Sequence, residues 1–329
     1  MEIGADRQPL HVALERQIRR WRNLPSRLAL RASNYPYVRV LLRRRHDVAL
    51  ARHRGQLPAL DALSAEIVSA IEERGLYVTT LDHLGLSASE TMLASSTKLA
   101  QEFAEEARLR VRCGEDFLIV PSHRIIANPE IFLWGLQDRL LNIAEAYLGL
   151  PPAYDGVTVN YTVADGREIS TRKWHRDWED RRMLKIAIYL HDVDENAGPF
   201  QMIPRKDAHS GDIDGFSYEL ADDQDLARHL GPDFAADIAS CEGPRGTVIF
   251  TDTARFYHRG KPATGRDRAA IFYSYFASRP RHPFLCERTG MSRRAMYRMA
   301  KDLPQRQRNA VRWRKQISPL LRMIPPALL

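Results

Sequence analysis

A change in residue pattern after Pro152 constrains the fold of this chain more than any other sequence feature. From there to residue 277, short runs rich in β-branched and aromatic residues are separated by Gly, Pro, Asp and Asn. The runs span residues 157–163, 173–178, 183–193, 200–203, 247–252 and 268–277. Because most of them follow one another without an intervening helix, we expect antiparallel strands in a sandwich or barrel.

The segments on either side of these strands have helical patterns, so the expected fold class is α+β. A helix is predicted from about residue 60 to 74, where Gly75 ends it, and residues 76–80 form a further strand. Ser87-x-x-Glu90 is a capping box that predicts a helix to about residue 110. A further helix is expected from Asn128-Pro129 to about Gly149. Part of an acidic insertion over 207–240 is also expected to be helical, and so is the N-terminal segment in which Leu14, Ile18 and Trp21 alternate with arginines.

Charge is distributed unevenly along the 329 residues. Residues 1–60 carry +9 and residues 279–329 carry +11, and with +8 overall this leaves −12 for residues 61–278. Either the basic ends bind an anionic surface or partner, or they pack on the chain's own acidic middle and are otherwise solvated. The pattern predicts a basic helical extension over 1–60, a core domain over 61–280 and a second basic helical extension over 281–329.

Targeting and cysteine patterns indicate a cytoplasmic protein. No apolar run reaches the roughly 18 residues of a membrane span, and the first ten residues lack the apolar stretch of a secretory signal. The three cysteines, Cys113, Cys241 and Cys286, are widely spaced, which predicts neither a disulfide framework nor a zinc cluster. A reducing compartment agrees with this pattern.

Common catalytic signatures are absent, which leaves His175-Arg176-Asp177 as the first candidate site. The sequence contains no GxSxG, GxGxxG, GxxxxGK[ST] or HExxH motif. In a strand, residues two apart project from the same face, so an imidazole and a carboxylate can reach one metal ion. With a third ligand they would form the facial triad of non-haem Fe(II) enzymes. Such a pair arises easily by chance among 11 His and 41 acidic residues, so its context has to decide.

The context consists of features that follow one another in order. Trp174 precedes His175, and the strand 184–190, the segment Gly198–Pro204, the strand run 246–252, His258 and Arg268 follow it. In this order and spacing, residues 61–280 resemble the phytanoyl-CoA dioxygenase-like family of Fe(II)- and 2-oxoglutarate-dependent oxygenases. The resemblance implies a double-stranded β-helix, or jelly roll, with helices packed around it.

Residue by residue, the resemblance implies an iron site and a co-substrate site. His175, Asp177 and His258 would be the iron ligands, and Arg268 would pair with the distal carboxylate of 2-oxoglutarate, the co-substrate used with dioxygen. A guanidinium forms two parallel hydrogen bonds to a carboxylate, which suits it to that role. Arg266 is the nearest competitor, but it belongs to the turn 261–265 and its continuation, whereas Arg268 adjoins the strand that follows.

Four further residues are weaker candidates for contacts to the co-substrate or substrate. Lys185 and Tyr189 share one face of the strand 184–190, opposite an apolar face. That face either lines the barrel interior or is a solvated outer face. Asn160 and Thr162 alternate on the strand before His175, and they are candidates for the same contacts with the same two alternatives open.

The chain departs from the family pattern at two places. Two positions after the third ligand the family commonly has a hydroxyl residue, where this chain has Gly260, so Tyr189 is our candidate for the missing contact. After Pro204 the usual Gly-Ser-His is replaced by residues 205–210, and we expect His209 to be a loop residue and not a ligand. Trp174 and Arg176 are expected to be packing and surface residues.

The function predicted from these residues is hydroxylation of an unactivated C–H bond of a small molecule, such as a natural product or an acyl or lipid-linked compound. Desaturation and cyclisation remain open, and so does the identity of the substrate. No nucleic-acid partner is expected. The alternative is a non-catalytic barrel whose basic ends bind an anionic partner or membrane surface, with residues 311–324 as an interfacial helix.

Overall fold

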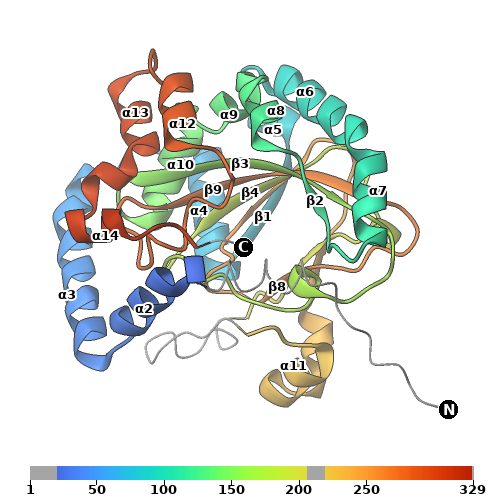
Figure 1. Ribbon diagram of the computed structural model, residues 1–329, viewed down its shortest axis with the longest axis horizontal. Coiled ribbons are helices and arrows are strands. Elements are labelled where there is room, and N and C mark those ends of the chain that lie inside the picture. The colour runs from blue at the N-terminus through green and yellow to red at the C-terminus, as the bar shows by residue number, and fades with distance from the viewer. Residues whose placement is uncertain (1–20, 206–218, 328–329) are drawn as a thin grey trace.

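The computed structural model describes residues 21–205 and 219–327, and two antiparallel sheets lie at its centre (Figure 1). The larger has six strands in the order β1-β7-β4-β9-β3-β2, and the smaller has three in the order β6-β5-β8. The expected α+β class with a jelly-roll core is thereby confirmed. The strands are β1 (Leu76–Thr80), β2 (Leu118–Ile119), β3 (Pro152–Thr162), β4 (Leu184–Tyr189), β5 (Phe200–Met202), β6 (Ala239–Cys241), β7 (Thr247–Thr251), β8 (His258–Gly260) and β9 (Arg268–Ala277).

Strand β4 shows how the larger sheet separates two environments. Leu184, Ile186 and Ile188 pack into the main hydrophobic core beneath the helices. Ala187 and Tyr189 point to the opposite side and pack in a second cluster that includes residues of β5 and β6. The face that carries Lys185 and Tyr189 is therefore the interior of the jelly roll and not a solvated outer face.

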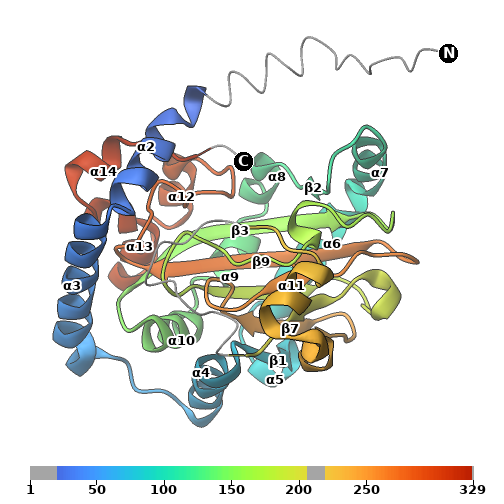
Figure 2. The ribbon, with the colours of Figure 1, turned by 90° about the horizontal axis from the view of Figure 1, so that it is seen from below.

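Helices cover the outer face of the larger sheet. Among them, α4 and α10 lie side by side (Figure 2). The left-handed backbone of Gly75, with φ of +78°, ends α4 as expected. The helices between residues 62 and 230 are α4 (Ala62–Arg74), α5 (Leu81–Leu84), α6 (Ser89–Glu102), α7 (Ala104–Arg112), α8 (Ser122–Ile126), α9 (Pro129–Trp134), α10 (Asp138–Leu148) and α11 (Asp223–Leu230).

Three local predictions are wrong in detail. Ser87 is not a helix cap: its hydroxyl donates to Gln137, α6 begins at Ser89, and the expected single helix is divided into α6 and α7. The helix expected from Asn128 to Gly149 is divided into α9 and α10 by residues 135–137. The strand expected over 173–178 is reduced to isolated bridges at Trp174 and His175.

Two N-terminal helices, α2 (Leu24–Ser33) and α3 (Pro36–His53), lie at one end of the molecule. The Ser26 hydroxyl donates to the Pro325 carbonyl at 2.8 Å, and His53 Nε2 lies 2.8 Å from Glu145 Oε1. These contacts attach both helices to the rest of the fold. Most of the helix expected around residues 14–22 falls outside the described residues, and so does His209.

The C-terminal segment is packed on the core and does not form one interfacial helix. Trp313 is 1% exposed and Ile317 is 5% exposed, in a hydrophobic cluster with β3 and β9 residues. Arg314 lies 3.1 Å from Glu287 and donates to the Pro283 carbonyl. The segment is divided into α12 (Arg293–Met299), α13 (Gln305–Val311), the 3-10 helix η7 (Trp313–Gln316) and α14 (Pro319–Met323). The chain division at residues 60 and 280 stays a prediction.

This packing predicts unequal effects for two nearby aliphatic residues. Ile317→Ala should lower the free energy of unfolding by about 2–3 kcal/mol, because it removes buried methyl groups and leaves a cavity. Leu320→Ala, three residues away and 78% exposed, should change it by less than about 0.5 kcal/mol. Urea denaturation of both variants measures the difference, and equal values would show that the segment is not packed as described.

None of the helices among the described residues combines the length and the apolarity that crossing a bilayer requires.

Candidate metal and co-substrate site

Backbone pairing brings the three predicted metal ligands together. His175 and His258 form an antiparallel bridge, in which the N–H of each donates to the carbonyl of the other at 3.1 and 3.0 Å. The Asp177 N–H donates to the Thr253 carbonyl at 2.8 Å. Two segments more than 75 residues apart in the sequence are thus held side by side at the edge of the smaller sheet.

The geometry of the three side chains suits a single ion. One ligand atom each of His175, Asp177 and His258 can be chosen so that all lie within 4.8 Å of one another, and all three residues are buried. His258 Nε2 lies 3.9 Å from Asp177 Oδ2, and the two imidazole centroids are 4.3 Å apart. Two imidazoles and one carboxylate are the donors of the Fe(II) facial triad, so the residues fit that metal.

Hydrogen bonds and burial leave both histidines ready to bind a metal. His175 Nδ1 lies 2.8 Å from the Lys173 carbonyl, and His258 Nδ1 lies 3.2 Å from the Phe256 carbonyl. A carbonyl only accepts, so Nδ1 carries the proton in each ring and Nε2 carries the lone pair that a metal ion would use. Burial lowers the pKa of both, that of His258 to about 3, which keeps the rings neutral at physiological pH.

Asp177 is ionised through its contact with Lys185. Burial alone would raise the pKa of this carboxyl, but the ammonium of Lys185, 2.5 Å from Oδ2, holds the pKa well below its usual range. Lys185 therefore lies beside the triad, with its charge directed at Asp177, and its role in binding the co-substrate stays a prediction.

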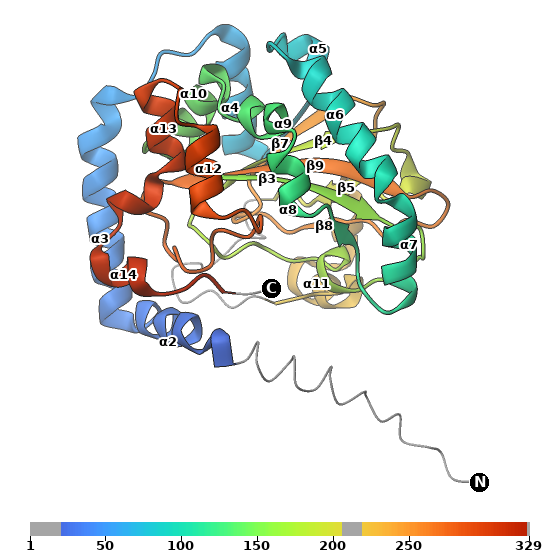
Figure 3. The ribbon, with the colours of Figure 1, turned by 45° about the horizontal axis from the view of Figure 1, so that its top comes forward.

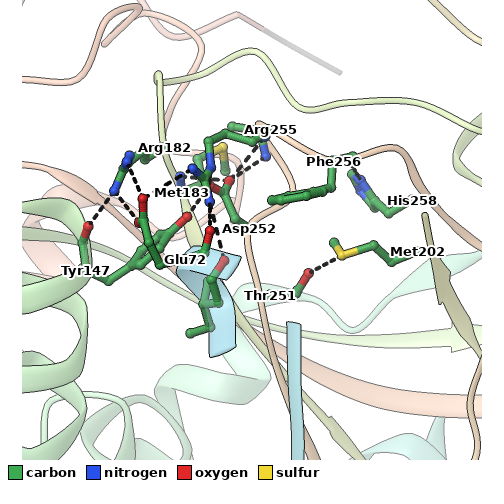
Figure 4. Close-up of polar contacts among 12 residues, drawn as sticks. Glu72, Tyr147, Arg182, Met183, Met202, Thr251, Asp252, Arg255, Phe256 and His258 are labelled. Atoms are coloured by element: carbon green, nitrogen blue, oxygen red, sulfur yellow. Dashed lines mark hydrogen bonds and ion pairs between the residues drawn. The ribbon is translucent and has the colours of Figure 1, made fainter. Parts of the chain in front are cut away.

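A buried carboxylate, Asp252, fixes the turn that leads to His258 (Figure 4). It accepts hydrogen bonds from the N–H groups of Ala254 and Arg255, from the Arg255 side chain and from the Tyr147 hydroxyl. Arg255 also lies over the Phe256 ring, with its guanidinium carbon 5.1 Å from the centroid. Asp252 was missed as a site residue, because its partners are identified only by the fold.

Arg268 lies against Gly260 in the interior. The two consecutive strands β8 and β9 belong to opposite sheets. The Arg268 guanidinium is directed across the space between them, donates to the Gly198 carbonyl and would lie only 2.5 Å from a Cβ built on Gly260. Gly260 thus leaves room for the guanidinium, which gives the missing hydroxyl residue a steric explanation.

This contact predicts that Gly260→Ala impairs co-substrate binding without affecting metal binding. The added methyl group displaces the guanidinium, so the half-saturating concentration of 2-oxoglutarate should rise about tenfold. Gly55→Ala is the control, because a Cβ there meets no atom within 4 Å. Titration of 2-oxoglutarate against succinate release measures the effect, and identical curves for the two variants would contradict it.

The remaining predicted residues line the same interior. The Tyr189 hydroxyl donates a hydrogen bond to the Cys241 carbonyl and accepts one from the Phe200 N–H, so backbone groups already use it both as donor and as acceptor. Asn160 Oδ1 is buried and has no hydrogen-bond partner in the described part of the chain. Thr162 pairs in register with Arg268 on the neighbouring strand.

An ion pair near the triad was not predicted. Glu179 continues the alternation of His175 and Asp177 and is buried, with Oε1 3.1 Å from Arg288 Nε. Burial raises the pKa of Glu179, and the nearby Asp177 charge raises it further. Extending the two-residue spacing beyond Asp177 would have indicated Glu179, whereas Arg288 comes from the C-terminal segment and has no local signal.

Comparison with known proteins gives structural matches only. No family model matches the chain, and no curated protein matches it. EctD from S. alaskensis, in its apoform, is 21% identical with a TM-score of 0.45, covering 66% of this chain and 78% of that chain. SnoK, a non-heme alpha ketoglutarate dependent carbocyclase from nogalamycin biosynthesis, is 18% identical with a TM-score of 0.43, covering 68% and 88%. HygX from Streptomyces hygroscopicus is 15% identical with a TM-score of 0.41, covering 67% and 88%.

The two antiparallel sheets thus form a jelly roll, and the buried His175, Asp177 and His258 form a candidate site for one metal ion with the donor set of an Fe(II) facial triad.

Proposed function

We propose that this protein is an Fe(II)- and 2-oxoglutarate-dependent dioxygenase that hydroxylates an unactivated C–H bond of a small molecule. His175, Asp177 and His258 hold the iron, and Arg268 binds the distal carboxylate of 2-oxoglutarate. Lys185, Asn160 and Thr162 are proposed to contribute polar contacts in the same interior. Tyr189 is proposed to act through the backbone groups that it holds, because its hydroxyl already has two partners.

The observation that carries this proposal is a buried arginine without a counter-ion. Arg268 is 9% exposed, and no carboxylate within residues 21–205 or 219–327 forms an ion pair with it. Burial lowers the pKa of its guanidinium, which reflects the cost of keeping the charge away from water. A ligand carboxylate would offset that cost through two charge-assisted hydrogen bonds.

The position of Arg268 relative to the metal ligands supports a ligand that spans both. Gly260, which the guanidinium contacts, lies two residues after His258 on β8. Residues two apart in a strand share a face and are about 7 Å apart. A short dicarboxylate with a keto group is of this length.

The proposed reaction balances with dioxygen as oxidant. One oxygen atom enters the substrate C–H bond as a hydroxyl group, and the other enters succinate as 2-oxoglutarate loses carbon dioxide. When bound, Fe(II) supplies the site at which dioxygen is activated. The chain's own part is to keep both imidazoles neutral, to keep Asp177 ionised and to exclude water from the buried triad.

Glu179 and Arg288 are proposed to face the substrate. Their ion pair lies beside the triad, and Arg288 is close enough to contribute, after burial and several nearer groups, to the low pKa of His175. A buried pair of opposite charges favours a polar or zwitterionic small molecule over a purely apolar one.

The free cysteines agree with the proposed cytoplasmic location.

Turnover without a known substrate tests the proposal. Purified full-length protein supplied with Fe(II), 2-oxoglutarate, ascorbate and dioxygen should release succinate slowly, and a library of small polar compounds should contain one that accelerates it. A product that has gained one oxygen atom identifies hydroxylation, whereas loss of two hydrogens identifies desaturation or cyclisation. Failure to release succinate with iron bound would favour the non-catalytic scaffold instead.

A further inference from the structure

Helix α2 turns its apolar side toward solvent. Leu24, Leu28 and Ala32 of α2 follow one another at spacings of four residues, which places them on one face; Trp21 lies three residues before Leu24, ahead of the helix, and all four are exposed. Trp21 is 71% exposed and Leu28 is 55% exposed. A surface helix normally buries such a stripe, so this orientation indicates a surface that something else covers.

Helices α3 and α14 extend this apolar surface. Tyr37 is 80% exposed, Leu41 follows it one turn later, and Met323 of α14 is also 80% exposed. Of the fifteen large hydrophobic side chains exposed in the described part of the chain, eleven belong to residues 21–48 or to α14. All three helices lie together at one end of the molecule (Figure 3). We call their exposed side the α2–α3–α14 surface.

The opposite sides of these helices are anchored, so the exposure is a property of the packed fold. Leu50 of α3 lies against Gly149, where a Cβ would meet its Cδ2 at 2.7 Å. Asn34 accepts a hydrogen bond from Arg281, and Ser26 joins α2 to the segment after α14. The apolar stripe cannot turn inward without breaking these contacts.

The charge of the surface selects among the partners that could cover it. Residues 21–56 carry nine arginines and a single acidic residue, Asp47. A second copy placed face to face would bring two such surfaces together, and like charges repel. A nucleic-acid backbone would neutralise the arginines but would leave the leucines and Trp21 without an apolar environment. An anionic lipid surface satisfies both, because arginine side chains reach the headgroups while the apolar side chains enter the acyl boundary.

We propose that the α2–α3–α14 surface docks this protein on the surface of an anionic membrane, with the helices lying in the plane of the interface. This proposal is independent of the oxygenase reaction. The aromatic residues Trp21 and Tyr37 occupy the headgroup level, where amphipathic rings are favoured. The arginines of both helices supply the attraction to acidic lipids.

Co-sedimentation of the full-length protein with vesicles tests the proposal. The protein should bind phosphatidylcholine vesicles that contain phosphatidylserine and should not bind vesicles of phosphatidylcholine alone. Replacing Arg43, Arg44 and Arg45 by Gln should weaken partitioning about a hundredfold, since each basic residue near the surface contributes about fivefold. Leu24→Ser combined with Leu28→Ser should weaken it at least about tenfold, because less apolar surface enters the bilayer.

Control variants carry changes of the same kind on other surfaces. Leu109→Ser alters an exposed leucine of α7, and the triple change of Arg112, Arg228 and Arg245 to Gln removes the same charge from other surfaces. Both controls should partition like the unmodified protein, and circular dichroism should show all variants folded. Equal loss in controls and variants, binding to both vesicle types, or no binding would overturn the proposal. So would dimerisation that the double Leu24→Ser, Leu28→Ser variant abolishes, or binding to duplex DNA that this double variant leaves unchanged.

Discussion

Asp177→Ala is expected to lower the release of succinate from 2-oxoglutarate by at least about a thousandfold. The same variant is expected to lose its bound Fe(II). The variant leaves only two imidazole donors in a site that needs three protein ligands, and it leaves the Lys185 ammonium beside them without its counter-ion. Both changes disfavour a bound cation. Substituting a residue that only hydrogen-bonds to a metal ligand already lowers metal affinity about 10–100-fold at comparable sites. Direct loss of a ligand should therefore lower it more. Metal content after gel filtration and succinate release by chromatography measure the two effects.

The control for this prediction removes a carboxylate that faces solvent. Asp302 lies in a C-terminal turn with an 85% exposed side chain, and Asp302→Ala should retain both iron and turnover. His258→Ala should behave like Asp177→Ala, with His83→Ala, an exposed histidine, as its control. Normal turnover in Asp177→Ala or His258→Ala would remove the triad from the reaction.

The sheet architecture could be predicted from the sequence because the strand period is short and local. The alternation from Leu184 to Tyr189 separates an apolar face from a mixed one, and the structure places the first against the helices and the second in the interior. Whether the mixed face lines the interior or faces solvent could not be decided locally. That depends on the helices that cover the sheet, α10 among them, which come from elsewhere in the chain.

The errors in the helices have a shared cause. Ser87-x-x-Glu90 has the residues of a capping box, but the Ser87 hydroxyl is used by Gln137, and Ala88 takes a left-handed backbone conformation with φ of 55° at the start of α6. A distant partner thus overrides the local signal. The same applies to residues 311–324, where Trp313 and Ile317 fit the core although their neighbours are basic.

The candidate site was accessible from the sequence only in its metal ligands and its arginine. His175 and Asp177 form a local motif, His258 was indicated by the family resemblance, and backbone pairing brings His258 beside His175. The supporting contacts are distant: Asp252 meets Tyr147, and Glu179 meets Arg288. Side chains that support a site through long-range contacts have no spacing rule, so a single sequence does not identify them.

Arg268→Gln is expected to raise the half-saturating concentration of 2-oxoglutarate by roughly 100- to 1,000-fold. The substitution keeps most of the side-chain volume between β8 and β9 but removes the positive charge and one of the two parallel donors. Two charge-assisted hydrogen bonds in a buried environment account for this magnitude. Iron affinity should stay within about threefold, because Arg268 does not contact the triad ligands. Succinate release as a function of 2-oxoglutarate concentration measures the first effect, and Fe(II) titration measures the second.

Arg266 provides the matched control, since it lies two residues earlier and was the competing candidate in the sequence. Its side chain is 56% exposed and pairs with Asp194 at the surface. Arg266→Gln should therefore leave the 2-oxoglutarate dependence unchanged, because an exposed ion pair contributes little and does not face the interior. If Arg266→Gln raised the half-saturating concentration and Arg268→Gln did not, the co-substrate would have to lie outside the space between the sheets. Equal, small effects of both variants would mean that the buried Arg268 charge is compensated by the Gly198 carbonyl and its neighbours, and not by a ligand.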